Sequence, residues 1–370
     1  MTCDFLSLAQ PGVQKLSPYV PGKPVEELAR EFGLNPQDIV KLASNENPLG
    51  PSPLAIEAIR RALPELTRYP DGNGFALKQA LSSRLGVSSG MITLGNGSND
   101  ILELVARAFV GRDDEVVFSE HAFAVYPIVT QAVGGRAVVV PAREWGHDLD
   151  AMAAAVSPAT RLVFIANPNN PTGTWIERAE LEAFLARIRP DVIVVLDEAY
   201  TEYVESADMP NGVDYLASYP NLLVSRTFSK AYGLAALRVG YGVCDPAIAD
   251  AMNRVRQPFN VNSLALAAAV ATLADEEYLV RSREVNRQGM AQLERGFAAL
   301  GLERIPSRGN FIAVDLGQDA APVFQALLRE GVIVRPVANY GMPRHLRVSI
   351  GLPAENQRFL DALSKVLSGE

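Results

Sequence analysis

The chain has 370 residues, 48% of them hydrophobic, and a formal net charge of −8. Its length and apolar content allow a large core and favour two domains. The acidic balance argues against nucleic acid as the main partner, because phosphate binding needs a basic face. Two cysteines and three scattered histidines predict neither a disulfide framework nor a metal site, and they suit a cytoplasmic protein. We expect no signal peptide and no membrane span.

The first 40 residues predict an arm followed by a short helix. Turn-forming residues at 17–22 indicate an extended segment, and the apolar spacing over 24–32 predicts a helix with one buried face. A loop rich in Asn and Pro, near Asn45, then opens the main body. Further helices are expected at 56–63 and 75–85.

From Met91 onward, strand patterns alternate with helical ones. Strands are expected at 115–119, 137–141, 162–166, 192–196, 222–225 and 239–243, with helices between most of them, including 101–110 and 178–187. Such alternation predicts an α/β fold with a large, mostly parallel sheet covered by helices on both faces.

The last third of the chain predicts a smaller α+β domain. The expected helices are 247–255, 263–273, 276–300 and 355–367, and the expected strands are 303–306, 310–315, 332–336 and 346–350. We therefore divide the chain into an arm and helix at 1–40, a large domain at 41–250 and a small C-terminal domain at 251–370.

Lys230 lies in the run T-F-S-K-A-Y-G-L-A-A-L-R, residues 227–238. Glycines and apolar residues around it make a poor setting for a solvated charge. Partial burial and a nearby cation, such as Arg238, lower the pKa of an amine and free it as a nucleophile. Taken alone, Lys230 also fits an ordinary surface lysine, and Arg238 also fits a phosphate ligand.

A glycine-rich turn at residues 93–100 precedes the helix expected at 101–110. Such a turn presents unpaired N–H groups and the positive end of the helix dipole to an anion. Ser98 and Asn99 add side-chain donors. The same residues also suit an ordinary helix cap.

Polar residues follow two of the expected parallel strands. The run N-P-N-N-P-T-G at 167–173 fixes the backbone around Asn170 with two prolines and a glycine. Asp197 ends the apolar strand V-I-V-V-L-D, where a buried carboxylate needs a cationic partner or serves as a helix cap. Ligands of parallel sheets bind at this edge, so both residues are candidate ligand contacts.

Together these motifs resemble fold-type I aminotransferases that depend on pyridoxal phosphate (PLP), and the resemblance covers nearly the whole chain. It implies PLP as cofactor, with Lys230, Asp197 and Tyr200 as catalytic residues. Lys230 is expected to hold the cofactor covalently, and Asp197 to keep its ring nitrogen protonated so that the ring withdraws electrons. The other implied contacts are Asn170 and Tyr200 at the ring oxygen, Ser98, Asn99, Thr227, Ser229 and Arg238 at the phosphate, Phe123 stacked on the ring, and Tyr69 from the partner in a homodimer. Phe123 stands where the family usually has tyrosine, so that hydroxyl is absent.

Three further runs are similar to histidinol-phosphate aminotransferases. They are Y-V-P-G-K at 19–23, L-A-S-N-E-N-P-L-G at 42–50 and S-R-G-N-F at 307–311. This resemblance implies exchange of an amino group between histidinol phosphate and 2-oxoglutarate or glutamate, in histidine biosynthesis. Arg347, in H-L-R-V-S-I-G, matches the arginine that binds the substrate anion. Arg335, Tyr19 and Asn170 complete the implied substrate site.

Other functions share these motifs. Imidazole and phenyl rings are similar in shape, so an aminotransferase for phenylalanine and tyrosine is the main alternative. Decarboxylation and β-elimination also occur with PLP on this fold. A non-catalytic ligand sensor is the remote alternative, since it needs an added DNA-binding domain and the enzyme-like pattern takes up the chain.

Overall fold

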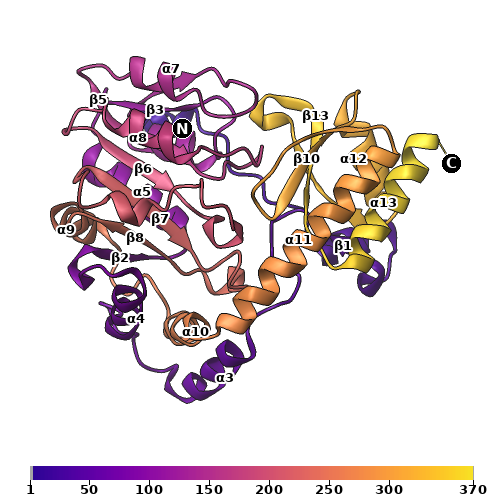
Figure 1. Cartoon of the computed structure of the whole chain (residues 1–370), viewed down its shortest axis with the longest axis horizontal. Helices are drawn as coiled ribbons and strands as arrows, with labels where there is room; N and C mark the ends of the chain where they lie inside the picture. The colour runs from indigo at the N-terminus through magenta and orange to yellow at the C-terminus, as the bar shows by residue number, and fades with distance from the viewer. Residues whose placement is uncertain (1–2, 370) are drawn as a thin grey trace.

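A seven-stranded sheet forms the centre of the larger part of the molecule (Figure 1). The computed structural model describes residues 3–369. In spatial order the strands are β2 (Ile92–Gly95), β8 (Gly240–Cys244), β7 (Leu222–Thr227), β6 (Ile193–Asp197), β5 (Thr160–Ala166), β3 (Glu115–Ser119) and β4 (Arg136–Val140). One strand, β8, runs opposite to the other six, so its pairs with β2 and β7 are antiparallel and the remaining pairs are parallel. The mostly parallel sheet predicted from the sequence is therefore confirmed.

Helices cover both faces of this sheet, as the alternating pattern predicts. One face packs against α5 (Ser98–Phe109), α6 (Val125–Ala132) and α9 (Pro246–Val255). The other packs against α4 (Phe75–Leu85), α7 (Leu149–Ala154), α8 (Arg178–Leu185) and α10 (Ser263–Leu273), with α3 (Pro53–Ala62) against α10. Successive side chains of a strand point to opposite faces, so strands covered on both sides are apolar throughout.

The carboxyl ends of the central parallel strands meet at one edge of the sheet. The register pairs Ala166 of β5 with Asp197 of β6, and Asp197 with Ser225 of β7. The loops that follow these strands therefore start side by side, although they are far apart in the sequence. This edge is where a parallel sheet places its ligand site.

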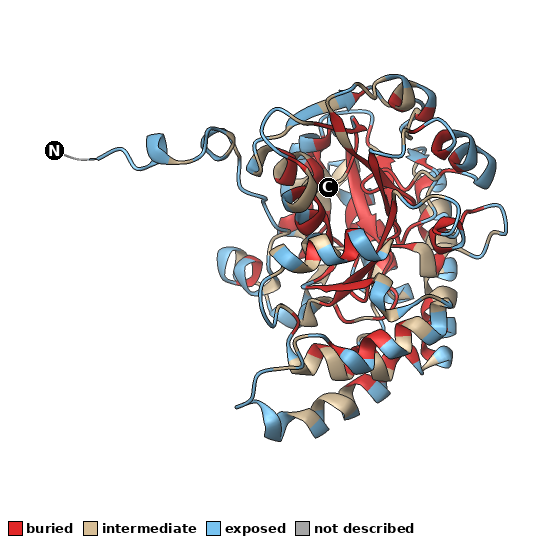
Figure 2. Ribbon diagram, turned by 90° about the vertical axis from the view of Figure 1, so that its left-hand side faces the viewer, coloured by how far each residue is buried: buried red, intermediate tan, exposed pale blue. Residues whose placement is uncertain are grey.

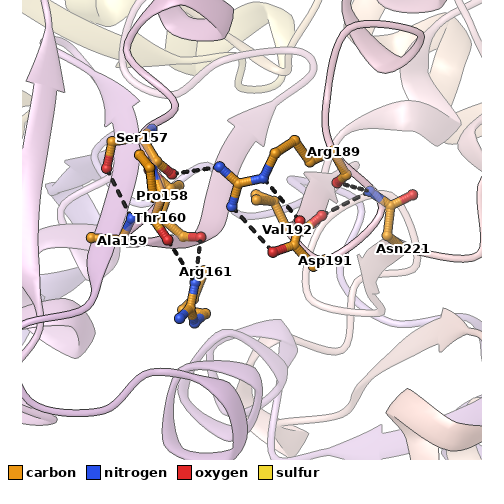
Figure 3. A network of polar contacts seen from close by, with 9 residues as sticks. All are labelled: Ser157, Pro158, Ala159, Thr160, Arg161, Arg189, Asp191, Val192 and Asn221. Atoms are coloured by element: carbon orange, nitrogen blue, oxygen red, sulfur yellow. Dashed lines mark hydrogen bonds and ion pairs between the residues drawn. The ribbon is translucent and has the colours of Figure 1, made fainter.

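The opposite edge is tied together by polar contacts between the loops that precede β5, β6 and β7 (Figure 3). The guanidinium of Arg189 donates to the Ser157 carbonyl at 2.7 Å and to both carboxylate oxygens of Asp191, at 2.9 and 3.2 Å. The side-chain amide of Asn221 donates to the Val192 carbonyl at 2.7 Å. These bonds fix the starts of the strands, and hence the register at the other edge.

A four-stranded antiparallel sheet forms the centre of the smaller part (Figure 1). In spatial order its strands are β12 (Arg335–Val337), β13 (Met342–Ser349), β10 (Phe311–Asp315) and β9 (Glu303–Ile305). Its core is shared with α11 (Glu276–Ala299), α12 (Ala320–Arg329) and α13 (Pro353–Ser368). The α+β arrangement expected for the last third of the chain is present.

The single strand predicted at 332–336 is wrong in one respect. The structure divides it into β11 (Val332–Ile333), which pairs with β1 (Val40–Lys41), and β12, which pairs with β13. Pro336 has no N–H to donate, and the register of β12 shifts beside it. The division of the chain at residues 40 and 250 stays a prediction. Residue 250 falls inside α9, which packs on the larger sheet.

The arm that starts at residue 3 lies on the outside of the molecule, and Figure 2 shows it extending away from the rest of the chain. This arm contains one 3₁₀ turn (Leu6–Leu8) and α1 (Pro11–Gln14), and Phe5, Leu6 and Leu8 are exposed. The next helix, α2 (Val25–Phe32), packs with the smaller part through Leu28. Over residues 3–369, no helix is both long and apolar enough to cross a membrane.

Candidate active site

A cavity of about 360 Å³ lies at the carboxyl edge of the parallel strands and reaches the smaller sheet. All the site residues predicted from the sequence except Tyr69 line it: Tyr19, Ser98, Asn99, Phe123, Asn170, Asp197, Tyr200, Thr227, Ser229, Lys230, Arg238, Arg335 and Arg347. Residues 43–45 also line it, although no role is predicted for them from the sequence.

Lys230 follows β7 in a tight turn. The Ser229 N–H donates to the Thr227 hydroxyl at 3.1 Å, which fixes the start of this turn. The lysine amine donates to the Ser44 carbonyl at 3.1 Å. Burial lowers the pKa of Lys230 to about 8, and the positive charge of Arg347 contributes to the lowering. The amine therefore loses its proton more readily than an exposed lysine does.

The N-terminus of α5 and the Arg238 side chain form a cradle for an anion. Gly97, with φ of +77°, leads into α5, and a Cβ added there would lie 2.5 Å from Arg238 Nη2. Arg238 itself has φ of +56° and donates to the Ser229 hydroxyl at 3.3 Å. A guanidinium, a hydroxyl and the free N–H groups of a helix start thus converge.

Asp197 ends β6 and is only 5% exposed. The hydroxyl of Tyr126, on α6, donates to Asp197 Oδ2 at 2.9 Å. Among the described residues Oδ1 has no hydrogen-bond partner. Burial raises the pKa of Asp197 to about 6, against the lowering effect of the Tyr126 bond. A buried carboxylate oxygen that faces a cavity without a donor is a place for a ligand's N–H.

The Tyr200 hydroxyl joins the two parts of the molecule. Its oxygen accepts from the side-chain amides of Asn45 at 3.0 Å and Asn170 at 3.2 Å. Burial raises the pKa of Tyr200 to about 12, so the phenol keeps its proton. Because the amides of Asn45 and Asn170 both donate to this oxygen, the Tyr200 hydroxyl can still donate its own proton to a ligand.

Arg347, on β13, is a buried cation held by neutral groups. It donates to Asn170 Oδ1 and to the Ala43 carbonyl, each at 2.6 Å, and within residues 3–369 its Nε has no partner. Arg335 lies opposite it in the β12–β13 register. Arg335 packs over the Tyr19 ring at 5.5 Å and donates to the Val20 carbonyl at 2.7 Å. Two guanidiniums side by side favour an anionic ligand.

These groups fit the predicted cofactor. The anion cradle beside Ser229 suits a phosphate, the free oxygen of Asp197 suits a protonated ring nitrogen, and the Tyr200 phenol suits a ring oxygen. Lys230 supplies an amine with a lowered pKa in the same cavity. Within the described part of the chain, no group of His, Cys, Asp and Glu side chains has the arrangement of a metal site.

Comparison with known proteins agrees with this chemistry. Residues 37–363 match the family model described as aminotransferase class I and II. The chain belongs to this aminotransferase family. It is 72% identical over 368 residues to histidinol-phosphate aminotransferase 2 of Pseudomonas fluorescens (strain Pf0-1), with 100% of each chain covered. It is 70% identical over 365 residues to histidinol-phosphate aminotransferase 2 of Pseudomonas aeruginosa (strain PAO1), with 99% of each chain covered.

A solved structure is also similar over nearly the whole aminotransferase chain. The crystal structure of histidinol-phosphate aminotransferase from Sinorhizobium meliloti in complex with pyridoxal-5′-phosphate has a TM-score of 0.90 and 34% sequence identity. The match covers 97% of each chain. The predicted fold class, that of the PLP-dependent transferases, is thereby confirmed.

Tyr69 lies outside the cavity of this aminotransferase. Its side chain is 82% exposed and stacks on Phe259, with ring centroids 4.8 Å apart and planes 20° apart. Phe259 has φ of +57°, which is rare for a bulky residue and strains the backbone. A Tyr69 role at the phosphate is therefore a proposal about a partner chain.

Two residues that contact the catalytic groups were missed by the sequence reasoning. Tyr126 stands in H-A-F-A-V-Y, three residues after Phe123. Phe123 precedes α6 and Tyr126 lies in its first turn, and the two rings meet edge-on with centroids 6.0 Å apart. Asn45 stands in the loop that was predicted without a role. A buried polar residue with φ of +54° has no signal in a single sequence beyond the tolerance of Asn for this backbone.

The lowered pKa of Lys230 gives a pH-dependent prediction. Without cofactor, labelling of Lys230 by an amine-reactive reagent should rise with pH and reach half its maximum near pH 8, because only the neutral amine reacts. Mass spectrometry of the labelled peptide at each pH measures this. Arg347→Ala should move the midpoint to higher pH, since it removes a charge that disfavours the ammonium.

Arg344→Ala is the matched control, because Arg344 is exposed and pairs with Asp315 on the outer face. Its midpoint should equal that of the unchanged protein. A midpoint near 10.5 in the unchanged protein would contradict the assignment of Lys230 as the activated amine.

Proposed function

We propose that this aminotransferase transfers an amino group between histidinol phosphate and 2-oxoglutarate, with PLP as its cofactor. The observation that carries the proposal is Arg347, a buried guanidinium held by neutral groups in the cavity that contains Lys230. The names of the relatives, at 70% and 72% identity over the chain, support the same reaction.

Both substrates need a cation in the same pocket to bind their anionic group. Histidinol phosphate carries a phosphate where an amino acid carries its α-carboxylate, and glutamate must enter the same pocket in the second half of the reaction. A cation that is not neutralised by a protein carboxylate can bind either anion, and a guanidinium grips each with two parallel bonds. Arg335, opposite Arg347, adds a second positive charge for the phosphate dianion.

When bound, the cofactor would supply an electron-withdrawing ring. The residues of the chain would bind it, orient it and transfer the proton. Lys230 holds the cofactor and, when released, moves a proton at the substrate α-carbon. Asp197 would stabilise the positive ring nitrogen, and Tyr200 and Asn170 would bind the ring oxygen. Phe123 would pack against the ring, and the phosphate would be held by Ser98, Asn99, Thr227, Ser229 and Arg238.

The proposal includes a homodimer with shared sites. Tyr69 is 82% exposed and stacks on Phe259, which supports a role toward a second chain and not in its own cavity. Exposed apolar side chains near it, Leu66 and Phe75, suit burial in an interface. A cytoplasmic location is also proposed, since Cys3 and Cys244 are free thiols.

Substrate choice tests the function directly. With 2-oxoglutarate as the common acceptor, kcat/KM should be highest for histidinol phosphate and lower for phenylalanine and tyrosine, because only the first offers a dianion to Arg347 and Arg335. Steady-state kinetics with the three donors measures this. Equal or higher values for the aromatic amino acids would favour the alternative function.

Arg347→Ala should damage both half-reactions. Losing a charge-assisted hydrogen bond costs about 1.5–3 kcal/mol, so kcat/KM should fall about tenfold to a hundredfold for histidinol phosphate and for glutamate. Arg347→Lys should restore activity only in part, because an ammonium lacks the fork of a guanidinium. Single-turnover kinetics from each side measures the two effects.

Arg344→Ala again serves as the control and should leave both rates unchanged. Normal reaction of glutamate in Arg347→Ala would show that the two anions do not share an anchor. Arg335 and Tyr19 would then be the better candidates for the phosphate.

Mixed dimers test the shared site. If Tyr69 serves the partner's phosphate, Tyr69→Ala and Lys230→Ala chains, each of low activity alone, should regain activity when combined in one dimer, because one of its two sites then has both residues. Activity is measured after verified subunit exchange. Mixing Lys230→Ala with Asp197→Asn is the control and should give no recovery, because both residues belong to the same chain's site. An inactive Tyr69→Ala/Lys230→Ala heterodimer would contradict sharing.

A further inference from the structure

Tyr126 lies directly behind the carboxylate that the proposed mechanism uses. Its hydroxyl donates to Asp197 Oδ2 at 2.9 Å, and the other oxygen, Oδ1, is the one left free among the described residues. Asp197 lines the cavity, whereas Tyr126 does not. The tyrosine therefore acts on any ligand only through the aspartate.

The Tyr126 ring is held in one orientation from several sides. It is fully buried and stacks on Phe164 of β5, with centroids 4.5 Å apart and planes only 7° apart. The Phe123 ring meets it edge-on at 6.0 Å and 88°. The Thr130 hydroxyl donates to the Tyr126 carbonyl at 2.8 Å. A ring packed in this way can direct its hydroxyl to the Asp197 carboxylate without paying further rotamer entropy.

We propose that Tyr126 is a positioning residue that keeps Asp197 ionised and turns its free oxygen toward the cofactor's ring nitrogen. This inference rests on the proposed function, because it needs PLP in the cavity. The proton shared by the ring nitrogen and Asp197 then stays on the nitrogen, where the ring can withdraw electrons. Without the Tyr126 bond, the proton moves toward the carboxylate and the ring loses its positive charge.

The chemical type of the donor matters. A lysine or arginine behind Asp197 would neutralise the carboxylate and weaken its hold on the ring nitrogen. A phenol stabilises the carboxylate through a hydrogen bond and adds no charge. Burial, followed by the negative charge of Asp197, raises the pKa of Tyr126 well above its usual value, so it stays a neutral donor.

Apart from hydrogen bonds, most of the surroundings of Asp197 favour its protonated form. Burial favours the protonated acid, and the neighbouring charge of Glu198 acts in the same direction. The Ala199 N–H and the charge of Lys230 oppose them, but less than the Tyr126 bond does.

Tyr126→Phe is the deciding variant, because it removes one hydroxyl and keeps the ring stack. With cofactor labelled by ¹⁵N in the ring, the nitrogen NMR signal at pH 7 should move from the protonated position toward the neutral one. Losing a hydrogen bond to a charged group should change the ratio of protein with the proton on the ring nitrogen to protein with the proton on Asp197 by about tenfold. We expect kcat to fall about tenfold while KM for both substrates stays within a factor of two to three.

Tyr215→Phe is the matched control. Its hydroxyl also donates to a carboxylate at 2.9 Å, that of Glu182, and neither residue lines the cavity, so neither the nitrogen signal nor kcat should change. Asp197→Asn sets the reference for a ring nitrogen without its carboxylate. If the unchanged protein binds no cofactor at Lys230, the proposed function fails. If the unchanged protein binds the cofactor but Tyr126→Phe leaves the nitrogen signal unchanged, only the positioning role fails.

A second variant covers the case in which Tyr126→Phe does not fold. Site-specific 3-fluorotyrosine at position 126 keeps the ring and makes the hydroxyl a stronger donor. The ring nitrogen should then stay protonated, with kcat at or above that of the unchanged protein. A shift of the signal toward the neutral position in this variant would contradict the proposal.

Discussion

The site depends on charged groups that are buried beside neutral partners. Asp197 is bonded to a phenol, the Lys230 amine to the Ser44 carbonyl, and Arg347 to an amide oxygen and a carbonyl. Burying a charge is costly unless hydrogen bonds or an opposite charge compensate. Hydrogen bonds to neutral groups reduce this cost and leave each charge available to a ligand. The seven-stranded sheet fixes the carboxylate, and the smaller sheet fixes the guanidinium.

This arrangement follows from chain topology. Parallel strands end at one edge, so Asp197 and the loop that contains Asn170 meet there, while the antiparallel pair β10 and β13 brings Arg347 to the same cavity from the other side. Neither sheet alone builds a complete site.

Much of this was readable from the sequence, because each motif follows a strand or starts a helix. Apolar runs with terminal polar residues predicted the sheet and its ligand edge, and Lys230, Asp197 and Asn170 stand in such places. The rest depends on contacts between distant segments. Asn45 reaches Ser349 across more than 300 residues of sequence, and Tyr126 reaches Asp197 from a separate helix. Periodicity gives the buried face of a helix, but it does not say which buried hydroxyl meets which carboxylate.

The loop around Asn45 has a consequence for the molecule as a whole. Its backbone N–H and side-chain oxygen are bonded to Ser349, its carbonyl accepts from Asn310, and its amide donates to Tyr200. Two of these partners belong to the smaller sheet region and one to the larger. Ligand affinity and the relative placement of the two sheets are therefore thermodynamically linked, and the linkage is reciprocal. A ligand that strengthened the Tyr200 contact would stabilise this placement of the two sheets, and this placement would strengthen ligand binding by the same free energy.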